Sequence, residues 1–262
     1  MPLSLVSTLS RLQFRGPAPV RALVRRASRT IAVRPGAILF GPGAGVYVDP
    51  DGTNPGYRLG TTEPLLQRAL AAELRPGDTF YDIGACVGFF SLIAARLVGS
   101  EGCVYAFEPL PLNMGVLQRN VLQNGYSHVQ MIEAAVGARS GRAEFVATRR
   151  DASHLARDQG EAGERISVKV FAIDDFLATS DARPPTFVKV DAEGSDLDVL
   201  VGAAATLRRH LPVVVVEVHW RSPELLEFFR AELPQYTVSG LDRPQSEVAS
   251  IANFHLVARP RR

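Results

Sequence analysis

Two acidic residues and a short glycine turn are the part of this sequence best suited to chemistry. Asp82 ends an apolar run and leads into Gly84, Ala85 and Gly88, after which a second apolar run begins. Glu108 closes the next strand-like run. An acid and small residues at a strand-to-helix turn, followed one strand later by a second acid, can hold a nucleoside that carries a charged tail.

The spacing of the glycines separates the possible nucleoside ligands. A dinucleotide fingerprint has the pattern G-x-G-x-x-G, whereas Gly84 and Gly88 are four residues apart and follow an acid. In enzymes that use S-adenosylmethionine, an acid after the first strand positions the methionine part, and an acid after the second strand binds both ribose hydroxyls. Asp82 and Glu108 stand where this scheme requires them, so S-adenosylmethionine is the expected cofactor.

Apolar periodicity predicts the elements that must hold these residues. Strands are expected over residues 79–83, 103–107, 129–135, 143–148, 166–173, 187–190 and 213–218, and helices over 65–74, 88–97, 112–123, 197–208 and 223–233. A hairpin is expected over 44–60, a polar loop over 149–165, and a closing antiparallel pair over 236–239 and 253–258. Strands that alternate with helices are typical of an α/β fold with a doubly wound, mostly parallel sheet.

Two further residues are expected to contact the donor. Ala135 ends a strand-like run and is small enough to let the adenine ring lie against it. Glu63 opens the helix that precedes the first strand, where it either reaches the donor's amino group or stabilises the helix start through the helix dipole.

A second charged group follows the strand expected at 187–190. Lys189, Asp191 and Glu193 alternate along this strand and its exit, so their side chains point the same way. One interpretation is a structural ion pair of Lys189 with either acid. The other is a ligand site, because open parallel sheets bind ligands just outside the carboxyl ends of their strands.

Transfer of a methyl group to an alcohol needs a group that takes the hydroxyl proton. Asp191 is the first candidate base, with Lys189 orienting the acceptor or stabilising its oxyanion and Glu193 contacting the acceptor. His219 follows the strand expected at 213–218 and is the second candidate, although a single histidine at a strand end is also a common packed residue. Two carboxylates beside a lysine suit a hard cation poorly, so no metal is expected.

The order of these motifs resembles that of a known family. The motifs are Tyr57-x-x-Gly60-x-x-Glu63, Pro76-Gly77-Asp78, Asp82-Ile83-Gly84-Ala85-x-x-Gly88, Ala106-Phe107-Glu108-Pro109, Asn120 with Asn124, Ala135-Val136-Gly137 and Lys189-x-Asp191-x-Glu193-Gly194. Between about Tyr57 and His219 the sequence is similar to the FkbM family of S-adenosylmethionine-dependent methyltransferases. The resemblance implies a Rossmann-like class I fold with a seven-stranded, mostly parallel sheet, helices on both faces and methylation of a sugar or polyketide hydroxyl. One departure is Cys86, where the family usually has Asn.

Composition sets the remaining expectations. The chain has 262 residues and a net charge of +2, but its first acid is Asp49, so we expect a basic extension over residues 1–43 and a methyltransferase domain over residues 44–262. The extension resembles an organellar transit peptide in composition, or it is a solvated or surface-associating tail. Two cysteines without metal or disulfide spacing, and no long apolar run, predict a cytoplasmic protein without a membrane span.

Three functions remain open at this point. One is an O-methyltransferase that acts on a small molecule, and another is a donor-binding protein without turnover. The remaining one is a nucleic-acid methyltransferase, which the basic start suggests. The sequence argues against this last function because no basic stripe with interleaved aromatic residues follows the basic start. We therefore expect a small-molecule acceptor and no nucleic-acid partner.

Overall fold

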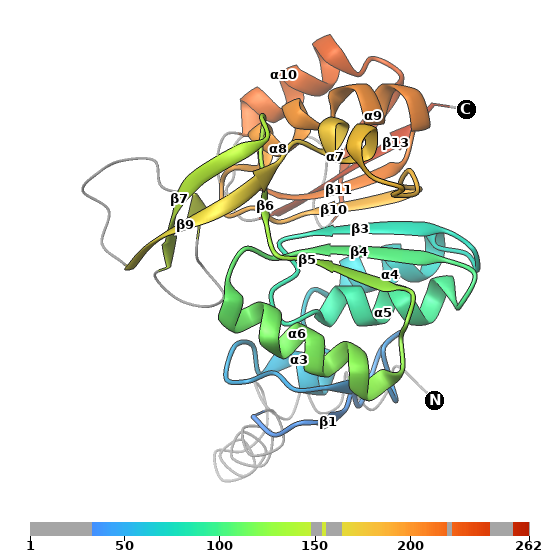
Figure 1. Cartoon of the computed structure of the whole chain (residues 1–262). Coiled ribbons are helices and arrows are strands. Elements are labelled where there is room, and N and C mark those ends of the chain that lie inside the picture. Colours follow the sequence, from blue (N-terminus) through green and yellow to red (C-terminus); the bar gives the residue numbers. More distant parts are fainter. Residues whose placement is uncertain (1–32, 148–153, 156–163, 219–221, 242–253, 262) are drawn as a thin grey trace, which may run out of the picture.

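A twisted seven-stranded sheet forms the centre of the molecule (Figure 1). The computed structural model describes residues 33–147, 154–155, 164–218, 222–241 and 254–261. The strands are β3 (Thr79–Ile83), β4 (Cys103–Phe107), β5 (Val129–Ile132), β10 (Phe187–Val190), β11 (Val213–Val218), β12 (Tyr236–Gly240) and β13 (Phe254–Pro260). Their order is β12-β13-β11-β10-β3-β4-β5, and β13 runs antiparallel to both of its neighbours while the other pairs are parallel. The predicted fold class and the closing antiparallel pair are confirmed.

Helices cover both faces of this sheet, as predicted (Figure 1). One face carries α3 (Gly56–Leu59), α4 (Pro64–Glu73), α5 (Phe89–Val98) and α6 (Pro111–Asn124); the other carries α7 (Ile173–Thr179), α8 (Asp196–Gly202), α9 (Ala204–His210) and α10 (Ser222–Glu232). Each face has its own apolar core, and β3, β4 and β10 are buried along their whole length. Because these strands are covered on both sides, their sequences are nearly continuous apolar runs.

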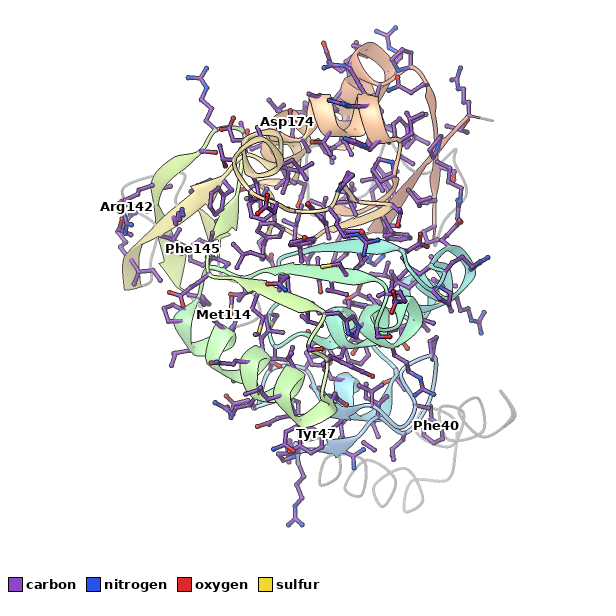
Figure 2. All side chains as sticks on the ribbon, turned by 45° about the vertical axis from the view of Figure 1, so that its right-hand side comes forward. Phe40, Tyr47, Met114, Arg142, Phe145 and Asp174 are labelled. Carbon is purple, nitrogen blue, oxygen red and sulfur yellow. The ribbon has the colours of Figure 1, made fainter. Side chains whose placement is uncertain are left out.

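A second, four-stranded sheet projects from one end of the first. It has the order β6-β9-β7-β8, from β6 (Ala135–Val136), β9 (Glu164–Phe171), β7 (Gly141–Ala147) and β8 (His154–Leu155). The prediction of one strand over 129–135 is therefore wrong, because the chain leaves the first sheet after Ile132 and joins the second at Ala135. The predicted loop over 149–165 contains β8 and the start of β9. Figure 2 shows Phe145 facing the main body of the molecule and Arg142 at the outer edge.

The hairpin before the first sheet begins earlier than its turn residues suggest. Gly36–Ala37 (β1) pairs with Tyr47–Val48 (β2), and Ile38 is 2% exposed, so the packed part includes residues before the expected start at residue 44. Two amides of α6 hold the hairpin. Asn124 exchanges hydrogen bonds with the backbone of Tyr47, and Asn120 does the same with Asp49 and also donates to the Val87 carbonyl. Asn120 therefore has a structural role.

The predicted helix over 197–208 is two helices, α8 and α9. The Asp174 carboxylate accepts hydrogen bonds from the backbone N–H groups of Ala205 and Thr206 at 2.9 and 2.8 Å, so it caps a new helix start. Asp174 belongs to α7, a helix that the periodicity analysis did not predict. Among the helices that the structure describes, none combines the length and apolar character needed to cross a membrane.

Candidate functional site

A cleft opens at the carboxyl ends of the parallel strands, where open α/β sheets bind their ligands. It holds about 830 Å³ of space, including solvent at its mouth. Gly84 forms its floor with a φ of 76°, and a Cβ atom at this position would lie 1.9 Å from the carbonyl oxygen of Asp191. Only glycine combines this backbone conformation with so close an approach of two strand exits. The exits of β3 and β10 therefore form one continuous surface.

Glu108 follows β4 and lies on one side of the cleft. One oxygen of its carboxylate accepts a hydrogen bond from the Cys86 N–H at 2.8 Å, and the other accepts from the Leu110 N–H at 3.0 Å and from the Asn113 amide at 3.2 Å. Glu108 is only 5% exposed, and these three donors fix the orientation of its carboxylate. Burial raises the pKa of Glu108 to about 7, against the lowering effect of its hydrogen bonds.

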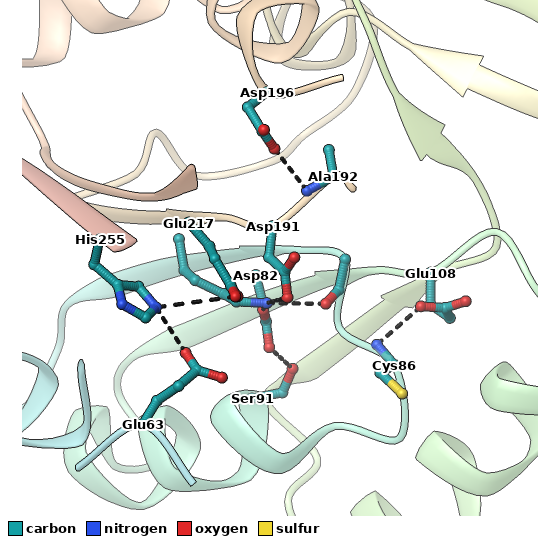
Figure 3. A network of polar contacts seen from close by, with 12 residues as sticks. Glu63, Asp82, Cys86, Ser91, Glu108, Asp191, Ala192, Asp196, Glu217 and His255 are labelled. Atoms are coloured by element: carbon teal, nitrogen blue, oxygen red, sulfur yellow. Dashed lines mark hydrogen bonds and ion pairs between the residues drawn. The ribbon is translucent and has the colours of Figure 1, made fainter. Parts of the chain in front are cut away.

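Lys189 is the centre of a buried charge network, and Figure 3 labels two of its acids, Asp82 and Asp191. Its Nζ donates to the Gly84 carbonyl at 2.9 Å and lies 3.3 Å from both Asp82 Oδ1 and Asp191 Oδ2. Burial acts to lower the pKa of Lys189, but the carboxylates around it, chiefly Asp82 and Asp191, raise it above its usual range. The ammonium group thus donates hydrogen bonds to Gly84 and Asp191 and forms an ion pair with Asp82, and the lysine holds the exits of two strands in one arrangement.

Asp82 lies beneath the cleft surface. It is fully buried, and its second oxygen accepts a hydrogen bond from the Ser91 hydroxyl at 2.5 Å. Gly88, whose φ is 90°, caps the N-terminus of α5 and also lies outside the lining. Asp82 and Gly88 lie behind the turn, whereas Ala85 and Cys86 line the cleft.

A third group of ionisable residues lies on the opposite side of Asp82 and Asp191 from Glu108 (Figure 3). The Nε2 atom of His255 is 2.9 Å from Glu63 Oε2 and 4.0 Å from Glu217 Oε2. Glu63 lines the cleft and is also the N-cap residue of α4, although its side chain makes no capping hydrogen bond. Glu63 therefore begins the helix and also lines the cleft, with its carboxylate in contact with His255.

Aromatic side chains also line the cleft, and the sequence analysis had not assigned them to the site. Tyr57 stacks on Phe89 with a ring separation of 4.6 Å. Burial raises the pKa of the Tyr57 hydroxyl well above its usual value, as do nearby groups that include Cys86 and Glu63. Ser91 was also missed, although a hydroxyl in the apolar run of α5 was a usable signal.

The structure brings most of the predicted site residues together. Eight of them line the cleft: Glu63, Gly84, Ala85, Glu108, Ala135, Lys189, Asp191 and Glu193. His219 lies outside the described residues. The cleft therefore unites the expected donor turn with the charged group that follows β10.

Comparison with known proteins assigns a family to this arrangement. The model of the FkbM methyltransferase domain matches residues 82–237, more than half of the chain. The chain belongs to the FkbM methyltransferase family. This FkbM domain includes Glu108 and the Lys189 network, whereas Glu63 and His255 lie outside the matched residues.

Two curated methyltransferases are similar to this FkbM-family chain. The 31-O-demethyl-FK506 methyltransferase FkbM of Streptomyces tacrolimicus is 27% identical over 177 residues, covering 56% of this chain and 67% of that protein. The hexuronic acid methyltransferase AglP of Haloferax volcanii is 26% identical over 154 residues, covering 58% of this chain and 60% of that protein. The chain thus matches no more than about two thirds of either relative.

A solved structure shares the fold of the FkbM-family chain. It is a proposed rRNA methylase from Clostridium thermocellum, which is similar at a TM-score of 0.51 and 12% identity. The similarity covers 74% of this chain and 93% of that chain. At this identity the likeness concerns the fold alone.

Cys86 adopts a backbone conformation that suits Asn, the residue that the sequence resemblance leads us to expect at this position. Cys86 has a φ of 51°, in the left-handed region that Asn adopts more readily than most other residues. Its contact with Glu108 comes from the backbone N–H, which any residue except proline supplies. Burial, followed by the nearby Glu108 carboxylate, raises the pKa of the Cys86 thiol to about 12, so the thiol is a poor nucleophile at neutral pH.

Replacing Cys86 by Asn should stabilise this FkbM-family protein by up to about 1 kcal/mol, because Asn relieves part of the cost of the left-handed backbone. Urea denaturation would measure the change in the free energy of unfolding. Cys86→Ala is the matched control, since alanine keeps the backbone cost and removes only the thiol. A Cys86→Asn variant less stable than the original protein would contradict this account.

Proposed function

We propose that this protein transfers a methyl group from S-adenosylmethionine to a hydroxyl of a small molecule. The observation that carries the proposal is the charge of the cleft. Four carboxylates line it, and Lys189, the one basic residue among its described lining residues, is already paired with Asp82 and Asp191. Phosphates of a dinucleotide would meet these carboxylates unfavourably, whereas a sulfonium and an ammonium group are attracted to them.

The lining residues offer a partner for each part of S-adenosylmethionine. The fixed Glu108 carboxylate faces the expected ribose position, and Ala135 and Leu110 supply small and apolar surface for the adenine. Gly84 lines the cleft where we place the methionine part. Glu63 provides a carboxylate for the donor's ammonium group on the opposite side of the cleft from Glu108.

Asp191 is the residue we assign to the proton of the acceptor. When bound, S-adenosylmethionine supplies a methyl carbon on a sulfonium that an acceptor oxygen can attack. Asp191 lines the cleft with 24% of its side chain exposed, so its carboxylate can take the hydroxyl proton as the new C–O bond forms. Lys189 donates to the Gly84 carbonyl and positions Asp191 through their ion pair. Its positive charge stabilises the oxyanion that develops on the acceptor. His219 remains the alternative base.

The acceptor class follows from the site and from the names of the relatives. The names of the two relatives specify 31-O-demethyl-FK506 and hexuronic acid, which supports hydroxyl-bearing small molecules as the first panel to test. Donor-dependent release of S-adenosylhomocysteine would be measured with sugars, uronic acids, polyketides, lipids, RNA and DNA. Turnover confined to RNA or DNA would favour the nucleic-acid alternative, and donor binding without any turnover would favour a binding protein. We place the reaction in the cytoplasm, consistent with Cys86 and Cys103 forming no disulfide in the part of the chain that the structure describes.

Replacing Glu108 by Gln should weaken donor binding by about 10–100-fold, since hydrogen bonds to a charged acceptor contribute about 1.5–3 kcal/mol. Binding should also depend on pH. The Glu108 carboxyl, with its pKa of about 7, is protonated at lower pH, so the donor's dissociation constant should rise about tenfold as the pH falls from 8 to 6. Isothermal titration calorimetry would measure both effects.

The Glu108→Gln variant should lose this pH dependence because glutamine does not titrate. Glu101→Gln, at an exposed position, is the matched control and should keep the original affinity and pH profile. Equal donor binding by the Glu108→Gln variant and the original protein would exclude Glu108 from the donor site and remove the main support for the proposed function.

A further inference from the structure

Three side chains from distant parts of the chain converge at the β11–β13 end of the cleft edge. Glu217 and His255 are direct partners across the antiparallel pair of β11 and β13, and Glu63 reaches them from the start of α4. One carboxylate oxygen of each Glu and one ring nitrogen of His255 all lie within 4.8 Å of one another. The side chains are 23%, 24% and 11% exposed for Glu63, Glu217 and His255. A small ligand can therefore reach atoms that the fold holds in place.

The atoms that converge here are those that bind metal ions. The distances from His255 Nε2 to the two glutamate oxygens are 2.9 and 4.0 Å. A cation about 2.0–2.2 Å from each ligand atom brings those atoms to separations of roughly 3–4 Å, so small side-chain shifts would complete the site. One imidazole with two carboxylates favours first-row transition cations over Mg²⁺ or Ca²⁺, which prefer oxygen ligands alone.

We propose that Glu63, Glu217 and His255 form a binding site for one divalent first-row transition cation, such as Zn²⁺ or Co²⁺. The cluster does not include Asp191 or Glu193, the two carboxylates that the sequence places beside Lys189. Three protein ligands leave coordination positions open for water or a ligand oxygen.

The place of the cluster suggests a role that rests on the proposed function. The sheet order β13-β11-β10-β3-β4 puts Glu108 on the opposite side of the Lys189 network from this cluster. Glu63 is also the carboxylate that we assign to the donor's ammonium group, so a cation bound by Glu63, Glu217 and His255 would compete with the donor for it and weaken donor binding.

Calorimetric titration with Zn²⁺ tests the site in the full-length protein after dialysis against a chelator. We expect binding of one ion, with Mg²⁺ at least tenfold weaker. Glu217→Gln and His255→Ala should each weaken Zn²⁺ binding by about tenfold or more. Co²⁺ should give a visible absorption band that the same variants lose. Glu227→Gln, which removes a carboxylate paired with Arg230 on the surface of α10, is the control and should leave Zn²⁺ binding unchanged.

Zn²⁺ binding that stays equal in both variants would overturn the site, as would the absence of binding at millimolar Zn²⁺ in the original protein. Circular dichroism of Glu217→Gln, which preserves side-chain size, would establish that a loss of binding is not a loss of fold. Binding of S-adenosylmethionine in the presence of chelator is measured on the same samples. This separates the two proposals, because the donor result tests the proposed function and the Zn²⁺ result tests the cation site.

Discussion

Replacing Asp191 by Asn should lower the rate of methyl transfer by about 10²–10⁴-fold, the range expected for loss of a general base. The donor's dissociation constant should change by less than about threefold, because we assign the ribose to Glu108 and the ammonium group to Glu63. Asn keeps the size of the side chain, and its amide oxygen can still accept a hydrogen bond from Lys189. Its amide cannot take a proton from an alcohol, so the loss should appear in kcat.

The experiment on Asp191 needs two measurements, one control variant and one variant of the alternative base. Release of S-adenosylhomocysteine gives kcat and KM for the acceptor, and calorimetry gives the donor affinity. Asp181→Asn, at an exposed position, should leave both unchanged. A large loss of donor binding in the Asp191→Asn variant would show that Asp191 holds the donor. If His219→Gln abolishes turnover while Asp191→Asn does not, the base is His219.

The order of elements in the main sheet was predictable because burial on both faces imposes a simple pattern. The apolar runs of β3, β4 and β10 are short, are bounded by turn residues and alternate with helical periodicity, so each was predictable from local sequence. The second sheet was not predictable in the same way. Its β6 strand is two residues long and pairs with β9, about thirty residues away, so the pairing depends on long-range contacts that periodicity does not encode.

The residues of the site also differ in whether local sequence could predict their place. Gly84 and Glu108 were predictable because a turn conformation and a strand end each leave a local signal. The pairing of Lys189 with Asp82 depends on the parallel register of β10 and β3, which places the two residues side by side. Likewise, His255 meets Glu63 across 192 positions of sequence, and only the sheet order brings them together.

Replacing Lys189 by Met should lower the free energy of unfolding by about 3–5 kcal/mol, the usual cost of removing one partner from a buried ion pair. Lys189 is 2% exposed and Asp82 is fully buried, so water cannot replace the lost ammonium group. Asp191 and the Gly84 carbonyl lose the same partner. The exits of β3 and β10 should separate as a result, and donor binding should weaken together with stability.

Lys169→Met is the matched control, because Lys169 is the other lysine of the sequence and lies exposed over the ring of Phe171. It should cost no more than about 1 kcal/mol, as an exposed cation–π contact does. The double variant Asp82→Asn/Lys189→Met should recover a large part of the stability, since it removes the buried charge that the single variant leaves unpaired. Urea denaturation of the original protein, Asp82→Asn, Lys189→Met and the double variant gives the coupling free energy. Leaving the Asp82 carboxylate buried without the lysine should be costly. A loss below about 1 kcal/mol in the free energy of unfolding of Lys189→Met would therefore contradict this account of the network.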